Sequence, residues 1–174
     1  MSEDTADPFR FVHVVEHIDV DDSGVMHFSR HHSLVETALL RGLAAVGAGL
    51  SALRAAGGDL VVAQSRAWFA APARHLDRLQ VTARLRRLGV YRSHVEGAVA
   101  LVGAAGPPTG LSRVELVLGV VSSADRRPAP WPDAISRILT TITNDGGAHG
   151  EFGQRRGGGR RGDPAAYAED AGLH

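Results

Sequence analysis

Residues 33–46 read SLVETALLRGLAAV and contain the longest helical pattern in the sequence. Their apolar residues recur with the 3.6-residue period of a helix that buries one face. The residues on this stripe are Leu34, Val35, Ala38, Leu39, Leu43 and Val46. Ser33 followed by Glu36 is a capping-box signature, so the pattern predicts a long helix from about Ser33 to Val46. A shorter helical piece follows and ends at Gly57.

The remaining regular segments have the composition and alternation of β-strands. One precedes the helix at residues 11–18, and four follow it at residues 60–69, 79–85, 91–101 and 113–122. Apolar and polar side chains alternate strictly in residues 79–85, which predicts one buried and one wetted face. The short link at Gly89 predicts that the third and fourth strands form an antiparallel hairpin. A short final helix is expected at residues 133–142.

These elements predict an α+β fold in which an antiparallel five-stranded sheet wraps around one long helix. The sheet has an amphipathic face that needs covering, and residues 33–46 form the only long apolar helix that the pattern predicts. The order of one strand, one helix and four strands is that of the hot-dog topology. We expect this domain to span residues 11–143. Residues 1–10 are expected to be a disordered leader, and residues 144–174 a disordered Gly/Arg-rich tail.

The composition narrows the classes of function. With 174 residues, of which 44% are apolar and 22% charged, the chain fits one globular domain. Its 19 basic residues, all arginine, equal its 19 acidic residues, so no net charge favours nucleic acid or an anionic membrane as a partner. The chain has no cysteine, which excludes disulfides, thiolate metal sites and a cysteine nucleophile. Without a signal-peptide pattern or a run of ~20 apolar residues, the expected location is the cytoplasm.

Two motifs carry a resemblance to a known family. Residues 19–31 read DVDDSGVMHFSRH, in which two acids flank one residue and a glycine follows the second acid by three positions. Residues 68–79 read WFAAPARHLDRL, with two aromatic residues, Ala-Pro, and an Asp that opens the next strand. In this order of elements, both motifs resemble the 4-hydroxybenzoyl-CoA thioesterase family of hot-dog enzymes. The resemblance implies a homodimeric or tetrameric enzyme that hydrolyses acyl-CoA or acyl-carrier-protein thioesters of fatty-acid or polyketide metabolism, without a metal or cofactor.

The resemblance also implies the catalytic residues. In this family a carboxylate attacks the thioester or activates water, and its position falls here on Asp21. Amide donors at the N-terminus of the following helix suit the oxyanion that forms. Some relatives place a His four residues after the motif glycine; this chain has Phe28 there, and His27 one position earlier is a second candidate. The family's acidic helix position matches Glu36, which is also the expected capping-box partner of Ser33.

The implied substrate-binding residues are Gly24, Gln64, Ser65 and Trp68. Gly24 belongs to the first motif, just before the helix. A second amide donor of the family maps near Gln64 and Ser65, on the strand that follows the helix. Trp68 and Phe69 are adjacent on that strand and must face opposite sides. We therefore expect one of them in the core, and the other near the acyl chain or a partner protomer.

Three rival interpretations use the same residues. Residues 19–24 match the start of a calcium-binding EF-hand loop, but the twelfth position of that loop is the cation Arg30 where glutamate is required. His27 and His31 are four residues apart and form a possible zinc pair, without an obvious third ligand. Asp21 before a glycine is also typical of a turn residue that bonds its own loop backbone.

The reaction stays open at this point. Hydrolysis of an acyl thioester is the first hypothesis. Addition of a nucleophile or water to an enoyl thioester is the second, although the chain lacks the Asn-Pro-x-His motif of hot-dog hydratases. Non-catalytic binding of an acyl thioester is the third. A serine-hydrolase mechanism has no Gly-x-Ser-x-Gly motif to support it.

Overall fold

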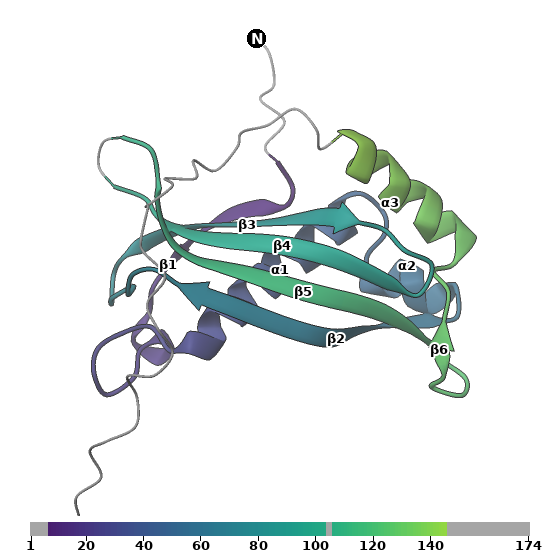
Figure 1. Cartoon of the computed structure of the whole chain (residues 1–174), viewed down its shortest axis with the longest axis horizontal. Coiled ribbons are helices and arrows are strands. Elements are labelled where there is room, and N and C mark those ends of the chain that lie inside the picture. Colours follow the sequence, from purple (N-terminus) through teal and green to yellow (C-terminus); the bar gives the residue numbers. More distant parts are fainter. Residues whose placement is uncertain (1–6, 104–105, 146–174) are drawn as a thin grey trace, which may run out of the picture.

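The computed structural model describes residues 7–103 and 106–145 (Figure 1). Its strands are β1 (Arg10–Val14), β2 (Gly58–Phe69), β3 (Arg78–Arg87), β4 (Arg92–Leu101), β5 (Thr109–Ser122) and β6 (Pro128–Ala129). Its helices are α1 (Phe28–Ala45), α2 (Leu50–Ala55) and α3 (Asp133–Asp145), and a 3-10 turn, η1, spans His17–Asp19. The order of elements is therefore the predicted one, with β6 as a short addition.

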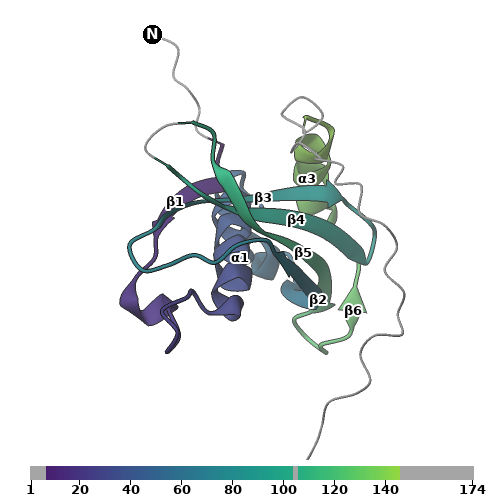
Figure 2. The ribbon, with the colours of Figure 1, turned by 60° about the vertical axis from the view of Figure 1, so that its left-hand side comes forward.

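The five longer strands form one antiparallel sheet in the order β1-β3-β4-β5-β2, and β6 pairs with β5. The helix α1 lies across one face of the sheet, and the strands curve around it (Figures 1 and 2). β3 and β4 form the predicted hairpin, in which Leu79 pairs with Leu101. The predicted α+β hot-dog fold, a five-stranded antiparallel sheet wrapped around one long helix, is confirmed.

The core forms where the buried stripe of α1 meets alternate residues of the central strands. Leu34, Val35, Ala38, Leu39 and Leu43 are buried on α1, and Val95 and Val99 are buried on β4. Gly97, between these two valines, permits a close contact with α1. A Cβ atom at residue 97 would lie 2.2 Å from Cγ1 of Val35. The helix therefore lies as close to the sheet as it does because residue 97 has no side chain.

The helix α3 covers part of the sheet edge that β1 leaves open. β1 pairs with residues 78–82, the first half of β3. α3 contacts β3 and lies beside its C-terminal end (Figure 1). Ile135 and Leu139 of α3 are buried in the main core together with Trp131. The outer edge of β3 is thus covered by β1 along its first half and by α3 along its second.

The opposite edge of the sheet is β2, which has no strand on its outer side within the described residues. Val62, Trp68 and Phe69 of β2 are 44%, 49% and 51% exposed. The prediction that one of the two aromatic residues belongs to the core is therefore wrong. Both lie at the uncovered end of an edge strand, where α1 and α2 do not bury them. Such an edge is a ready site for pairing with another chain.

The helix α1 begins at Phe28, earlier than the predicted start at Ser33. Its N-cap is His27, whose ring accepts a hydrogen bond from the backbone N–H of Ser29. Ser33 lies inside the helix and donates its hydroxyl hydrogen to the Ser29 carbonyl at 3.2 Å. The predicted capping box of Ser33 and Glu36 is therefore wrong, and Glu36 has no role in capping the helix.

The boundaries of the domain are described in part. α3 extends to Asp145, beyond the predicted boundary at residue 143. Residues 1–6 and 146–174 lie outside the described residues, so their predicted disorder stays a prediction. Arg10, predicted to belong to the leader, instead opens β1, and Phe9 packs against the core. None of the helices described here is long and apolar enough to cross a membrane.

Candidate functional site

Asp21 lies in a tight turn between η1 and α1. Its Oδ1 accepts hydrogen bonds from the Ser23 amide at 2.9 Å, the Ser23 hydroxyl at 2.5 Å and the Val25 amide at 3.3 Å. Gly24, with φ of +73°, donates its N–H to the Asp21 carbonyl, and this conformation favours glycine. The Ser23 hydroxyl, helped by the two amides, lowers the pKa of Asp21. The exposed carboxylate is therefore ionised at neutral pH.

Asp19, two residues before Asp21, is fully buried and ties this turn to the rest of the domain. Its Oδ1 accepts a hydrogen bond from Nε of Arg30 at 2.6 Å. Its Oδ2 lies 2.7 Å from Nε2 of His13 and accepts the Glu16 amide at 2.9 Å. Burial raises the pKa of Asp19, but the Glu16 amide, His13 and Arg30 outweigh burial and hold that pKa below its usual value. Asp19 thus joins β1 to α1, whereas Asp21 projects from the surface.

The two sequence motifs meet at this turn. Val25 forms an isolated β-bridge with Arg74, and the Met26 amide donates to the Ala73 carbonyl at 2.8 Å. Asp77, the acid of the second motif, accepts the Arg74 amide at 2.7 Å and so shapes the loop before β3. The second motif therefore supports the Asp21 turn through backbone hydrogen bonds.

A groove runs between the N-terminal half of α1 and β2, and we call it the α1–β2 groove. It has a volume of about 340 Å³. Its lining residues are Phe28, Ser29, His32, Glu36, Val62, Ser65 and Leu116. Residues 28, 32 and 36 are spaced by four and therefore share one face of α1. A bulge between Val62 and Gln64 changes the alternation of β2, so that Val62 and Ser65 both face the groove.

The groove contains an imidazole, a hydroxyl and a carboxylate. Nδ1 of His32 is hydrogen-bonded to Oγ of Ser65. Glu36 lies one helical turn further along α1, and its carboxylate makes no hydrogen bond or ion pair with the described residues. Phe28, which is 63% exposed, provides an apolar wall near the start of α1. Groups able to move a proton thus lie beside an apolar surface at the N-terminus of the longest helix.

The structure brings together some of the predicted site residues and separates others. Glu36 and Ser65 line the α1–β2 groove, and His32, to which the motifs assigned no catalytic role, lies between them. The signal for His32 was its spacing of four residues from both Phe28 and Glu36. Asp21 and its turn lie before α1 and are not among the residues that line the groove of one protomer.

Gln64 and Trp68 face the other side of the sheet. Trp68 pairs with Arg113 on β5, and the Arg113 guanidinium lies 5.4 Å from the centroid of the Trp68 ring. The next residue, Val114, is fully buried and points into the core, so Arg113 and Trp68 point away from it. Gln64 precedes the groove residue Ser65 and so faces outward as well. The substrate-binding roles of Gln64 and Trp68 stay predictions.

His27 and His31 point to different places and do not form a shared metal site. The Nδ1 atom of His27 caps α1 at the surface. His31 is 3% exposed, its Nδ1 lies 2.7 Å from Oγ of Ser112, and the Phe69 ring meets it edge-on. Burial, together with the neighbouring His32, lowers the pKa of His31 to about 4. Across the described ranges, no three His, Cys, Asp or Glu side chains group as metal ligands.

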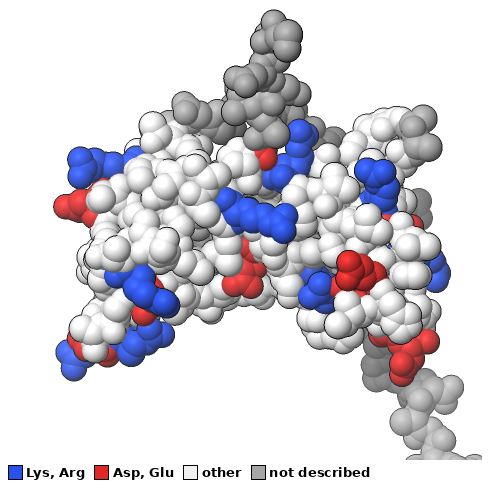
Figure 3. Space-filling view, turned by 180° about the vertical axis from the view of Figure 1, so that it is seen from behind, with Lys and Arg blue, Asp and Glu red and all other residues white. Residues whose placement is uncertain are grey.

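The face that carries α1 shows arginine and acidic side chains interspersed (Figure 3). No patch of one sign predominates on the described part of this face, in agreement with the equal numbers of basic and acidic residues. Such a surface does not concentrate polyanions by its field alone.

Comparison with known proteins identifies the family. A family model for the thioesterase-like superfamily matches residues 15–139, which include both motifs, the Asp21 turn and the α1–β2 groove. The chain belongs to the thioesterase-like superfamily. This membership confirms the resemblance that the two motifs predicted. No sequence among the curated proteins matches the chain.

Solved structures show how far the likeness of this thioesterase-like chain extends. It is 22% identical to a 1,4-dihydroxy-2-naphthoyl-CoA thioesterase from Synechocystis, with a TM-score of 0.67 over 79% of this chain and 96% of that one. It is 25% identical to the dynemicin thioesterase, with a TM-score of 0.67 over 77% and 96%. A hypothetical protein from Staphylococcus aureus in complex with CoA is 15% identical, with a TM-score of 0.73 over 90% and 95%. The hot-dog fold is thus shared along nearly the whole length of these chains.

Proposed function

We propose that this protein hydrolyses an acyl thioester of coenzyme A or of an acyl carrier protein. The observation that carries the proposal is the α1–β2 groove, where Glu36, His32 and Ser65 meet apolar residues at the N-terminus of α1. Membership of the thioesterase-like superfamily supports the class of reaction. The CoA-bound and CoA-thioester-cleaving relatives support coenzyme A as one carrier, and the polyene-binding dynemicin thioesterase supports a polyketide context.

The proposed reaction needs a carboxylate, an oxyanion site and a proton for the leaving group. Asp21 attacks the thioester carbon, or removes a proton from the attacking water, and its lowered pKa keeps it in the charged form that both roles require. The new C–O bond joins the acyl carbon to Asp21 or to water, and the C–S bond breaks. In the first case water then hydrolyses the acyl–Asp21 anhydride and frees the Asp21 carboxylate. The negative charge on the carbonyl oxygen is stabilised by the positive end of the helix dipole at the N-terminus of α1. The thiolate takes up the proton that comes from water, and the products are a carboxylic acid and the free thiol.

We further propose that two protomers pair through β2. The outer edge of β2 is open, and its apolar residue Val62 is 44% exposed. Val62 and Ser65 belong both to this edge strand and to the wall of the α1–β2 groove. Pairing would therefore place the groove at the interface and bring a second Asp21 turn into the assembly. Light scattering should show a dimer or tetramer at micromolar concentration, and a stable monomer would contradict the pairing.

Exchange of Asp21 for asparagine tests the catalytic assignment. Asn keeps the size and the acceptor oxygen for Ser23 but removes the charge, so the protein should fold. Turnover of a reactive acyl-CoA should fall roughly 10²–10⁴-fold, with binding of the thioester largely kept. Asp22→Asn is the matched control, because Asp22 is exposed in the same turn and has no role in the proposed reaction.

The alternative carboxylate is tested in the same assay. If Asp21→Asn keeps most of the activity while Glu36→Gln or His27→Ala abolishes it, the assignment to Asp21 is wrong. Glu36 deserves this test because it lines the groove without a partner among the described residues, and capping does not explain it.

The pair of His32 and Glu36 supports a second candidate function, the hydration of an enoyl thioester. An imidazole and a carboxylate one turn apart in a groove suit the addition of water to an enoyl thioester, in which one group activates water and the other protonates the α-carbon. A screen that offers enoyl-CoA and saturated acyl-CoA side by side separates the two reactions. Addition without hydrolysis would replace the proposed function by this one.

A further inference from the structure

The α1–β2 groove contains a hydrogen-bonded pair of side chains, His32 and Ser65, that bridges α1 and β2. Nδ1 of His32 is bonded to Oγ of Ser65. Nε2 of the same ring has no hydrogen-bond partner among the described residues. His32 is partly buried, and both side chains line the groove. One ring nitrogen is therefore held by the serine, and the other is free to meet a ligand.

The position of His32 on α1 places its ring over the start of the helix. Helical side chains lean toward the N-terminus, so each residue covers the turn before its own Cα atom. The turn before His32 contains Phe28 and Ser29, which also line the groove. This first turn of α1 is where the proposed reaction places the carbonyl oxygen of the thioester. The sulfur is bonded to the same carbon as that oxygen, so it lies near the His32 ring.

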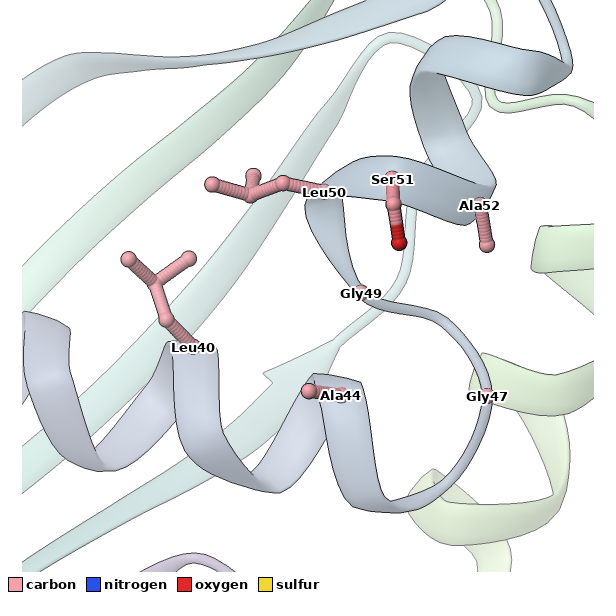
Figure 4. Close-up of a pocket in the computed structure, with 7 residues that line it drawn as sticks. All are labelled: Leu40, Ala44, Gly47, Gly49, Leu50, Ser51 and Ala52. Carbon is pink, nitrogen blue, oxygen red and sulfur yellow. The ribbon is translucent and has the colours of Figure 1, made fainter.

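A second hollow, between α1 and α2, differs from the groove in its chemistry (Figure 4). Its volume of about 330 Å³ is close to the 340 Å³ of the groove. Its lining residues are Leu40, Ala44, Gly47, Gly49, Leu50, Ser51 and Ala52. None of these side chains titrates near neutral pH. Of these two hollows, the groove is thus the one in which a side chain can exchange a proton with a bound thioester.

We propose that His32 is a catalytic residue that gives the leaving thiolate its proton, and that Ser65 is the positioning residue that orients the His32 ring. This inference rests on the proposed function. As the C–S bond breaks, its electron pair stays on the sulfur, and Nε2 of the protonated ring transfers its proton there. The neutral ring then takes up the proton that the attacking water has lost. His32 is unchanged at the end of the cycle, and the products are still a carboxylic acid and the free thiol.

The leaving group of a carrier thioester needs such a donor because it is basic. A free alkyl thiol such as that of cysteine has a pKa of roughly 8.5, so its thiolate takes up a proton at neutral pH. Histidine is the side chain that gains and loses a proton most readily in this range. The hydroxyl of Ser65 does not titrate there, which suits it to hold the ring.

The exchange His32→Asn tests the assignment. The amide of asparagine takes the place of Nδ1 and can keep the hydrogen bond to Ser65, but it has no atom at the place of Nε2. Histidine and asparagine have similar helix propensities, so the variant should fold. The matched control is His94→Asn. Because Val95 is buried, His94 points to the outer face of the sheet, outside the groove.

The assay compares two leaving groups on one acyl group. A CoA thioester releases a basic alkyl thiolate, whereas an S-4-nitrophenyl thioester releases a weakly basic aryl thiolate that departs without a proton. His32→Asn should lower turnover of the CoA thioester roughly 10²-fold and leave turnover of the aryl thioester near the wild-type value. Ser65→Ala should show the same selectivity with a smaller loss. Ser65→Thr keeps the hydroxyl and should keep the wild-type rate with both substrates.

Two results would overturn the role of His32 while thioester hydrolysis itself stands. An equal loss with both leaving groups would mean that His32 shapes the groove or acts on water. Wild-type turnover of the CoA thioester by His32→Asn would mean that the thiolate takes its proton from elsewhere. If the wild-type protein cleaves neither thioester, the proposed function fails and the role of His32 fails with it.

Discussion

Replacement of Asp19 by asparagine should destabilise the domain strongly. Asp19 is fully buried, and its carboxylate joins Arg30 on α1 and His13 on β1 at 2.6 Å and 2.7 Å. Asparagine has nearly the same size but no negative charge, so Arg30 loses its counter-charge. Removal of one partner from a buried ion pair costs about 3–5 kcal/mol. Since the side chains of Arg30 and His13 are 37% and 18% exposed, water compensates in part, and we expect a loss of about 3 kcal/mol.

Urea unfolding followed by circular dichroism measures this loss as a shift of the midpoint at constant slope. In a thermal scan the same loss should lower Tm by roughly 10 °C. The pKa of Asp19 is lowered in the folded state, so its charge stabilises the fold above the unfolded-state pKa, and this contribution disappears as the pH falls through the folded-state pKa. The difference between the wild type and Asp19→Asn should therefore be complete at pH 7 and shrink only in strong acid.

The matched control for stability is Asp22→Asn, the same exchange at an exposed position of the same loop. Its urea midpoint should equal that of the wild type. If Asp19→Asn unfolds at the wild-type midpoint at pH 7, the reasoning is refuted, because the hydrogen bonds of a buried carboxylate would then contribute nothing to stability.

Three further predictions concern packing, pH and the tail. Gly97→Ala should cost about 1–3 kcal/mol of unfolding free energy, because its Cβ would meet Val35, and the added exchange Val35→Ala should restore part of this loss. The pKa of His31 falls from 6.5 to about 4 on folding, so the free energy of unfolding should decrease by roughly 3 kcal/mol as the pH drops through this window. Urea unfolding at several pH values measures this decrease, and the same pH dependence in His31→Gln would assign the effect to other groups. Truncation after Asp145 should leave the unfolding curve and turnover unchanged, and a loss of either would show that the tail docks on the domain.

Most of the fold could be predicted because its core positions recur at regular intervals. The start of α1 could not, since residues 28–32 contain one apolar residue, Phe28, followed by polar ones. One of these, His31, is nevertheless buried, and its partner Ser112 lies 81 residues further along the chain. Histidine is not counted as apolar, so its burial does not appear in the hydrophobic pattern of residues 28–32. The pattern therefore placed the start of α1 at Ser33, five residues after its true start at Phe28.

The candidate site could be predicted only in part, because the roles of its residues depend on contacts between distant segments. Asp19 and Asp21 are the same residue type two positions apart, yet Asp19 is a buried anchor because the fold brings His13 and Arg30 to it. The α1–β2 groove depends on the bulge in β2. In a regular strand Val62 and Ser65 would face opposite sides, since they are three residues apart, and the bulge turns both toward α1.

The unequal edges of the sheet bear on whether copies of this chain polymerise. A sheet with two equivalent open edges can add further sheets at both ends, as fibrils do. On one side of this sheet β1 has only five residues, and α3 lies beyond it along the edge of β3. On the other side β2 has twelve residues and no strand on its outer side within the described chain. Two-fold pairing through β2 uses the same edge on both copies and leaves only the five-residue outer edge of β1 on each copy. By covering the second half of the β3 edge, α3 thus limits the edge that remains open to a third copy to the five residues of β1.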